Sequence, residues 1–284
     1  MLIDSHVHLD NDRYAEDRRA VLERADAADV GAMLCIGIGE QAAEMHRGLD
    51  VCRTFNGPNG ARTPGLPRLF ASAGVYPHTT AEIDDKVLTQ LDQLLAEPEV
   101  IACGEIGLDY YHEGASKAVQ KAGLIQQLEI AAARRRPITI HCRAEQDAPA
   151  ENPAAWNDLF EILDAHWRRT GLGGIMHCFS GDLVQACRSM ERGFLLSFAG
   201  NLTFPKAQPL REVASQLPIE SLLIETDAPW LAPMPERGKR NESALIVLTA
   251  NILAGLLNIS ETEIAAQTTK NFVRLFALPT DVGN

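Results

Sequence analysis

Short apolar runs alternate with longer amphipathic stretches along the whole chain. The runs are rich in Ile, Val, Leu, Ala and Gly, which is typical of strands buried on both faces, and they cover residues 2–7, 31–38, 69–75, 100–105, 137–141, 173–178, 193–198 and 221–226. Helix-like segments separate them, among them residues 15–29, 81–96, 117–135 and 155–169. Eight alternations predict an α/β protein with a parallel barrel, although an open doubly wound sheet has the same alternation.

The expected fold is a single (β/α)8 TIM barrel that takes up residues 1–284 as one domain, because such barrels routinely reach this length. An amphipathic stretch over residues 260–277 predicts an extra C-terminal helix packed across the outside. The Gly- and Pro-rich segment 56–68 precedes a strand and is expected on the bottom face. Segments 142–154 and 228–241 follow strands, so we expect them on the top face, where barrel enzymes have their active sites.

Composition and charge narrow the class of protein. The 284 residues are 46% hydrophobic with a formal net charge of −12, which counts against broad, non-specific nucleic-acid binding but allows a local anion site. Six cysteines without a CxxC pair predict free thiols in a reducing compartment. Since the sequence shows neither a signal-peptide pattern nor an apolar run of about 20 residues, we expect a cytoplasmic protein, a monomer or weak oligomer without membrane contact.

Candidate chemistry lies at the C-terminal ends of the predicted strands. His6 and His8 share one face of the first strand, so two imidazoles can converge on one ion. Further potential ligands close four other strands: Glu105, His141, His177 and Asp227. Buried ionisable side chains are costly unless they are paired or bind a metal, and a barrel brings strand ends to one rim. The sequence therefore predicts a metal site at the top of the barrel.

The motifs around these residues resemble those of the TatD family of metal-dependent deoxyribonucleases, from Ile3 to about Phe276. They are DSHVHL at 4–9, GEIGLDYY at 104–111, IHCR at 140–143, HCFSG at 177–181, ETDAP at 225–229 and RGKRNE at 237–242. The resemblance implies the barrel fold and two metal positions. It implies that the first is held by His6, His8 and Asp227, the second by His141 and His177, and that Glu105 bridges both.

The resemblance also implies a nuclease supported by Mg²⁺, with an end or a single strand of DNA as substrate. Four imidazoles favour Zn²⁺ or Mn²⁺ as the more tightly bound ions. Two ions about 3.5–4 Å apart can activate a water and stabilise charge on a phosphodiester. Asp227, which can accept the proton of that water, and the bridging Glu105 are the catalytic candidates.

Three features depart from the family pattern. Tyr76 stands before Pro77-His78, where a His-Pro-His form is common, and Ala144-Glu145 stands where an acidic residue followed by alanine is usual. The segment 56–68 is longer than expected. The first two departures concern substrate contacts, and neither alters the six predicted ligands.

Residues beside the ligands are interpreted as supporting groups. Glu225 and Asp4 each precede a predicted ligand by two residues and are expected to support it from behind, with Asp4 on the same strand face as His6. Cys142 and Cys178 follow predicted ligands directly, and strand alternation is expected to turn their thiols away from the metal.

Three polar residues near the predicted rim are candidates for substrate binding, and each has a structural alternative. Arg143 can bind a phosphate through its guanidinium fork or pair with a loop carboxylate. The turn at Ser180 can hold an anion at a helix N-terminus, or Ser180 can simply cap that helix. Asn201 can donate to substrate or stabilise its own turn.

The segment 228–241 adds a basic cluster and an aromatic residue. Arg237, Lys239 and Arg240 can draw a polyanion toward the site, or they can be solvated cations of a surface loop. Trp230 can stack on a nucleobase or cover the barrel mouth.

Three functions remain open from the residues alone. The first is hydrolysis of phosphodiesters in DNA, with removal of nucleotides from an end. The second is hydrolysis of another ester or an amide by the same two ions, for example misacylated tRNA, because one metal barrel serves many reactions. The third is a metal-binding scaffold without turnover.

Overall fold

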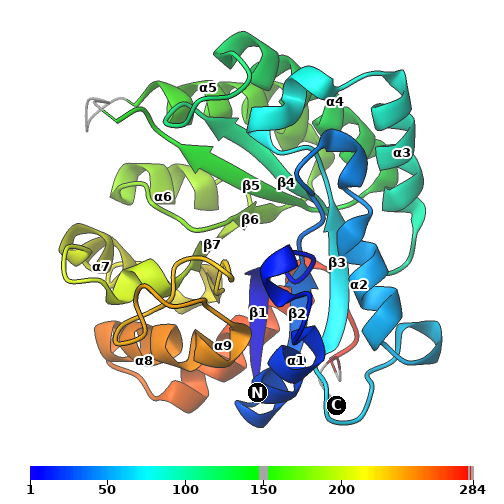
Figure 1. Ribbon diagram of the computed structural model, residues 1–284. Helices are drawn as coiled ribbons and strands as arrows, with labels where there is room; N and C mark the ends of the chain where they lie inside the picture. The colour runs from blue at the N-terminus through cyan, green and yellow to red at the C-terminus, as the bar shows by residue number, and fades with distance from the viewer. Residues whose placement is uncertain (147–152, 281, 283–284) are drawn as a thin grey trace.

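The computed structural model describes residues 1–146, 153–280 and 282, so part of the segment 142–154 lies outside the described residues. Within the described chain, eight parallel strands pair in sequence order around a barrel, as predicted (Figure 1). A further bridge between Val7 and Ala228 joins the end of the chain's last strand to its first. The strands are β1 (Leu2–Val7), β2 (Val30–Cys35), β3 (Arg68–Ala73), β4 (Val100–Asp109), β5 (Ile138–Arg143), β6 (Gly174–Met176), β7 (Phe194–Phe198) and β8 (Leu222–Ile224).

Helices follow the strands and cover the outside of the barrel (Figure 1). They are α1 (Arg18–Ala27), α2 (Arg47–Phe55), α3 (Asp85–Ala96), α4 (Lys117–Arg134), α5 (Ala154–Ile162), α6 (Leu183–Met190), α7 (Gln208–Ala214), α8 (Ile246–Leu257) and α9 (Glu261–Leu275). Among the described helices, no single one is both long and apolar enough to cross a membrane, and the pair 243–257 and 261–275 meets that test only jointly, across a bend of 105°.

Several predicted helices are shorter than expected because tighter or wider turns flank them. A 3₁₀ turn at Asp12–Tyr14 precedes α1, and another at Pro77–Glu82 precedes α3. The helix expected over 155–169 ends at Ile162 and continues as a π-helical turn, Leu163–Trp167. Apolar periodicity extends through such turns, so the sequence pattern alone does not mark where α-helical hydrogen bonding stops.

The C-terminal helix α9 packs against the strands, which corrects the expectation that it lies on the outside of the barrel. Phe272 of α9 and Phe276, just after its end, belong to one apolar cluster with strand residues, among them Ile3, Phe70 and Leu195. The side chain of Asn271 donates hydrogen bonds to the backbone oxygens at positions 219 and 222, at the start of β8. This helix therefore closes the lower end of the barrel and leaves the opposite end for the ligand-bearing strand termini.

Two of the ligand-bearing strands contain register irregularities just before their ligands. The pairing of β1 with β2 shifts between Asp4 and Val7, and that of β4 with β5 shifts between Cys103 and Ile106. Such an irregularity changes which side chains face the barrel interior. In β1 and β4 these irregularities interrupt the alternation of side chains between the two faces of the strand, at the places where His6 and Glu105 point into the barrel.

The segment 56–68 lies at the bottom of the barrel, where it was expected. Arg62 pairs there with Asp26 near the end of α1, and the side chain of Arg68 donates to the backbone oxygen of Gly60. The segment is therefore far along the strands from the ligand-bearing ends.

Candidate metal centre

The structure brings all six predicted ligands together at the top of the barrel. They lie near or just after the C-terminal ends of their strands, except Glu105, which lies within the longer β4: His6, His8, Glu105, His141, His177 and Asp227. The ends of β1 and β8 are tied directly, since the Asp227 amide donates to the His6 oxygen and the His8 amide to that of Ala228. Ligands from the first and the last strand are thereby held in one place.

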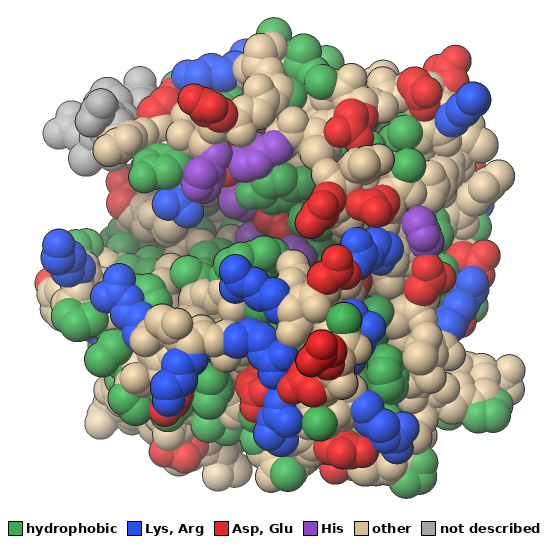
Figure 2. All heavy atoms as spheres, viewed as in Figure 1, with side chains coloured by type: hydrophobic (Ala, Val, Ile, Leu, Met, Phe, Trp, Pro, Cys, Tyr) green, Lys and Arg blue, Asp and Glu red, His purple; other side chains and the backbone are tan. Residues whose placement is uncertain are grey.

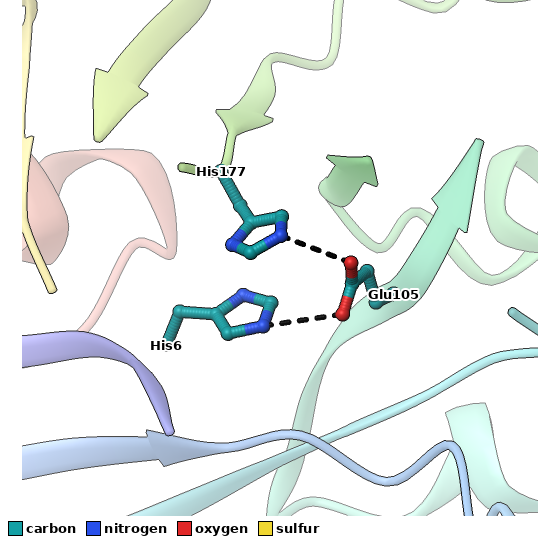
Figure 3. A group of neighbouring side chains, drawn as sticks. All are labelled: His6, Glu105 and His177. Carbon is teal, nitrogen blue, oxygen red and sulfur yellow. Dashed lines mark ion pairs between the residues drawn. The ribbon is translucent and has the colours of Figure 1, made fainter. Parts of the chain in front are cut away.

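Glu105 is buried at the centre of the group, and its two carboxylate oxygens face different imidazoles (Figure 3). Oε2 lies 3.2 Å from His6 Nε2, while Oε1 lies 2.9 Å from His177 Nε2. His141 Nδ1 is also 2.9 Å from Oε1. One carboxylate oxygen thus faces His141 and His177 and the other faces His6, which is the arrangement a bridging ligand needs.

The first group of donors consists of His6, His8 and Asp227. Asp227 Oδ1 lies 3.3 Å from His8 Nε2 and 3.8 Å from His6 Nε2, and the two Nε2 atoms are 3.2 Å apart. Two ligands of a tetrahedral ion at about 2.1 Å are themselves about 3.4 Å apart. The spacing of these three side chains therefore suits one metal ion.

The second group, His141 and His177, is oriented from behind by carboxylates. His177 Nδ1 lies 3.0 Å from Glu225 Oε1, which also accepts a hydrogen bond from the Cys178 amide. His141 Nε2 lies 3.1 Å from Asp109 Oδ2. Metal-binding histidines almost always use their second nitrogen in this way, which fixes the ring orientation.

Burial and mutual charge determine the protonation of these side chains. Burial raises the pKa of Glu105, but the imidazoles of His177 and His6 lower it more, so its pKa lies well below the ordinary value. Asp227 likewise has a lowered pKa, because the hydrogen bond from His8 and nearby imidazoles outweigh its burial. Both carboxylates are therefore ionised at neutral pH and available as ligands.

The imidazoles differ from one another. Burial and the charge of His177 lower the pKa of His6. Burial also lowers the pKa of His177, but Glu105 and Glu225 raise it more, so it lies well above the ordinary value. The rings of His6 and His177 stack 3.7 Å apart, so a neutral His6 ring lies against a protonated His177 ring. A metal ion requires neutral imidazoles and ionised carboxylates; His6, Glu105 and Asp227 already have that form, and the ion would replace the proton of His177, so the donor set fits such an ion.

A cavity of about 870 Å³ opens over the ligands. Figure 2 shows histidine side chains gathered in a hollow on this face, with Lys and Arg side chains across the surface below it. The walls of the cavity include five of the six predicted ligands, all but His6, together with aromatic, polar, basic and apolar residues: Tyr76, His78, His112, Arg143, Ser180, Asn201, Trp230 and Leu231. The size suits a ligand as large as a nucleotide.

Three of the predicted substrate contacts line this cavity. Arg143 is exposed, and its guanidinium lies 4.5 Å from the centre of the Tyr111 ring. Among the described residues it makes no ion pair with a loop carboxylate. Within the described part of the chain, the side-chain oxygen of Asn201 is buried without a hydrogen-bond partner, and its nitrogen lies 3.8 Å from Cys178 Sγ. Both side chains can therefore offer polar atoms to a substrate.

Ser180 also lines the cavity, but it is not the cap of the following helix. Asp182 is the N-cap of α6, where its carboxylate accepts from the Gln185 amide and Gln185 bonds back to the Asp182 amide. The capping alternative for Ser180 is therefore wrong. A carboxylate already occupies the helix N-terminus, so any contact of Ser180 with an anion has to come from its own hydroxyl.

The predicted basic cluster does not face this cavity as a unit. Arg240 is paired with Asp17 at 2.7 Å, and Lys239 pairs with Glu236. Arg237 is exposed and stacks 4.5 Å over the ring of Phe204. Neither Arg237 nor Arg240 borders the cavity above the ligands, so their contact with substrate stays a prediction. The sequence analysis did not predict the ion pairs of Lys239 with Glu236 and of Arg240 with Asp17.

Asp4 and Cys178 also lie differently from the expectation. The carboxylate of Asp4 accepts hydrogen bonds from Ser243, just ahead of α8, and from Thr226, and not from a side chain of the metal group. The register irregularity after Asp4 puts it on the opposite side of the strand from His6. Cys178 lies beyond the end of β6 with a φ of 43°, so alternation no longer applies and it borders the cavity.

Sequence reasoning missed three residues that lie beside His141. β4 continues four residues past the expected end, which places Asp109 at the same rim as the ligands. His78 and His112 contact its Oδ2 at 3.2 and 2.8 Å. Asp109 is part of the GEIGLDYY motif, so its motif membership was the available signal, but its carboxylate was not considered as a site residue.

A TIM barrel whose strand ends present four imidazoles and two carboxylates defines the class of metal-dependent hydrolase barrels. The family model described as TatD related DNase matches residues 3–277. The chain therefore belongs to the TatD family of metal-dependent hydrolases.

Individual relatives agree with this assignment. The metal-dependent hydrolase YabD of Bacillus subtilis is 34% identical over 98% of this chain and 100% of its own length. The 3′-5′ ssDNA/RNA exonuclease TatD of Erwinia billingiae is 29% identical, with 98% and 100% covered. The crystal structure of YJJV, a TatD homologue from Escherichia coli K12, superposes with a TM-score of 0.83 at 29% identity, covering 98% of each chain.

Proposed function

We propose that this protein hydrolyses phosphodiester bonds of DNA, removing nucleotides from an end or a single strand, with two divalent metal ions. His6, His8 and Asp227 would hold one ion, His141 and His177 the other, and Glu105 would bridge them. Mg²⁺ is the proposed working ion, while the imidazole-rich donor set also suits Zn²⁺ or Mn²⁺.

One observation carries this proposal: the two oxygens of Glu105 face two separate groups of imidazoles. Oε2 points to His6 at 3.2 Å, and Oε1 lies 2.9 Å from both His141 and His177. A single buried carboxylate between two donor groups suits a pair of ions better than one. When bound, such ions supply Lewis-acid activation of water and of the phosphoryl group.

Asp227 is the proposed proton acceptor. Its side chain is only 17% exposed but lines the cavity, and its pKa is lowered by His8 and the neighbouring imidazoles despite its burial. It is therefore ionised at neutral pH and positioned at the boundary between ligands and substrate, where a general base is needed. Glu225 and Asp109 keep the imidazoles of His177 and His141 oriented.

The cavity walls support a nucleotide substrate. Arg143 offers a guanidinium fork for a phosphate, and Trp230 is exposed at the rim, where it can stack on a base. The relative from Erwinia billingiae is named as an exonuclease acting on single-stranded DNA and RNA, which agrees with this substrate class.

The direct test compares end-labelled single- and double-stranded DNA in Mg²⁺, Mn²⁺ or chelator. We expect metal-dependent shortening of the labelled strand. Asp227→Asn, which keeps the size of the side chain, should lower kcat by about 100-fold or more, as loss of a general base does, while circular dichroism stays unchanged.

Asp85→Asn is the matched control, because Asp85 is exposed in the first turn of α3 and remote from the ligands. It should retain wild-type turnover. Full activity of Asp227→Asn in metal-replete buffer would remove its role as a base. Inertness of the wild type toward DNA, with activity on a panel of carboxylic esters and amides, would overturn the phosphodiester proposal itself.

A further inference from the structure

A second cluster of metal-binding side chains lies on the wall of the cavity, next to His141. It consists of His78, which follows β3, Asp109 at the end of β4, and His112 in the turn beyond it. One ligand atom of each lies within 4.8 Å of those of the others. His78 and His112 both border the cavity, and neither belongs to the two groups that surround Glu105.

The spacing of this cluster resembles that of the main centre. His78 Nε2 is 3.2 Å from Asp109 Oδ2, and His112 Nδ1 is 2.8 Å from the same oxygen. The imidazole nitrogens of the main centre lie 2.9–3.8 Å from their carboxylate oxygens. Two ring nitrogens and one carboxylate oxygen at this spacing form a donor set typical of transition-metal sites.

The carboxylate of Asp109 has more potential hydrogen-bond donors around it than it can accept from. Its Oδ1 accepts from the backbone amides of Tyr111 and His112. Its Oδ2 has three imidazole nitrogens around it, because His141 Nε2 lies at 3.1 Å in addition to His78 and His112. A carboxylate oxygen has only two lone pairs for such contacts. Three ring N–H groups cannot all be satisfied there.

His78 is the imidazole of the three that makes no hydrogen bond with Asp109 Oδ2. Its Nε2 is buried and has no hydrogen bond of acceptable geometry among the described residues, although it points at Asp109. Buried polar atoms normally have a partner. A cation between His78, His112 and Asp109 would use one lone pair of Oδ2 and leave the other for His141, which would satisfy every donor and acceptor of the cluster.

The backbone holds the two histidines in this arrangement. The Ala115 amide donates to the His78 oxygen. A side chain at Gly114 would lie 3.0 Å from the Cα of His78, so only glycine lets the 110–115 turn approach this closely. The Asp109 backbone is fixed in turn by Gln120 of α4. The cluster is therefore built into the rim and is not a chance meeting of flexible side chains.

We propose that His78, Asp109 and His112 bind a third divalent transition-metal ion, such as Zn²⁺, Co²⁺ or Mn²⁺, separate from the pair around Glu105. Three protein ligands leave a position that opens to the cavity, as in sites that bind water or an anionic oxygen. The partly exposed His112 makes this the most accessible ion of the three, so it exchanges most readily with solvent.

Metal counting tests the site without using enzyme activity. Chelator-stripped protein is titrated with Co²⁺, which is followed by its visible absorption, and bound metal is measured by elemental analysis. We expect His112→Ala and His78→Ala each to bind one equivalent fewer than the wild type, while the tighter equivalents keep their affinity. His166→Ala, at the far end of the α5 segment, is the control and should bind as many ions as the wild type.

Thermal unfolding of each stripped variant shows that it folds. The site is refuted when both His112→Ala and His78→Ala bind as many equivalents as the wild type. Because the result is a difference between chains, it does not depend on how many ions the main centre holds or on whether DNA is the substrate.

Discussion

Glu225 is fully buried beneath His177 and bonds both to its ring and to the Cys178 amide. It therefore sets the direction of a proposed ligand without touching the ion. We expect Glu225→Gln to weaken metal binding at the second position by about 10-fold or more, as loss of such an outer carboxylate does. Isothermal titration of stripped protein with Zn²⁺ measures this.

Glu220→Gln is the matched control, because Glu220 is exposed ahead of β8. Equal affinities of the Glu225 variant and wild type would show that His177 is held by the strand alone.

Two of the three arginines predicted to bind substrate, Arg143 and Arg240, are in different situations. Arg143 borders the cavity, whereas both terminal nitrogens of Arg240 are engaged by Asp17. We expect Arg143→Ala to raise KM for an oligonucleotide by about 10-fold or more, because a charged hydrogen bond to phosphate contributes about 1.5–3 kcal/mol. Arg240→Ala should leave KM within about twofold, since its exposed ion pair contributes about 0–1 kcal/mol to stability only. A larger effect of Arg240→Ala would restore it to the substrate path.

At the scale of elements, β4 pairs with β5 at His141, a predicted ligand of the second metal position. Gly107 pairs with His141, and it has a φ of 145°. A Cβ there would lie 1.9 Å from the His141 oxygen. We expect Gly107→Ala to lower the free energy of unfolding by about 3 kcal/mol or more, through steric conflict and an unfavourable backbone angle. Urea unfolding followed by circular dichroism measures the change.

Gly255→Ala provides the comparison. Gly255 lies in α8 with no atom near its would-be side chain, so alanine should stabilise the helix by about 0.5–1 kcal/mol. Equal stability of Gly107→Ala and wild type would mean that β5 can shift away without cost.

The order and direction of the strands were predictable because buried parallel strands leave continuous apolar runs. The register irregularities of β1 and β4 were not predictable, since a shift of strand pairing between Asp4 and Val7 does not change the pattern of hydrophobic residues. Asp4 was therefore expected on the wrong side of β1. The amphipathic pattern of α9 predicted a packed helix, but periodicity does not say which surface receives Phe272 and Phe276.

The candidate ligands were predictable for a similar reason. A histidine or carboxylate at the end of an apolar run is costly unless it has a partner, and five strands ended in this way. Asp109, His78 and His112 were missed because the last two lie in turns and the first lies beyond the expected end of its strand. Ion pairs such as Arg240 with Asp17 join distant segments, so they were not visible in the sequence.

For the molecule as a whole, metal binding and proton release should be coupled. Burial lowers the pKa of His177, but Glu105 and Glu225 raise it to well above the ordinary value, so the metal-free site holds a proton at neutral pH. A metal ion must displace that proton. We expect apparent metal affinity to increase as pH rises above 6.5, the ordinary pKa of histidine, and to keep increasing until the raised pKa of His177 is passed. Calorimetry in buffers of different ionisation enthalpy should detect protons released on binding.

An affinity independent of both pH and buffer would contradict this, and would mean that the imidazoles are already neutral without metal.

Metal binding should also stabilise the whole barrel, because the ligands come from strands around its circumference. At a metal concentration of about 1,000 times Kd, one site that exists only in the folded state adds about 4 kcal/mol. Chelator should lower the Tm accordingly.

Because β1 and β8 are neighbours in the barrel, the donor group that they share is complete only when the last strand has been synthesised. Glu105, His141 and His177 have all been added to the chain once the residue after β6 is made, but His6 and His8 then still lack the carboxylate of Asp227. Translation must reach the last strand before that donor exists. A product that stops short of β8 would carry the histidine pair without its acidic partner, so premature termination cannot yield a chain with all six predicted ligands.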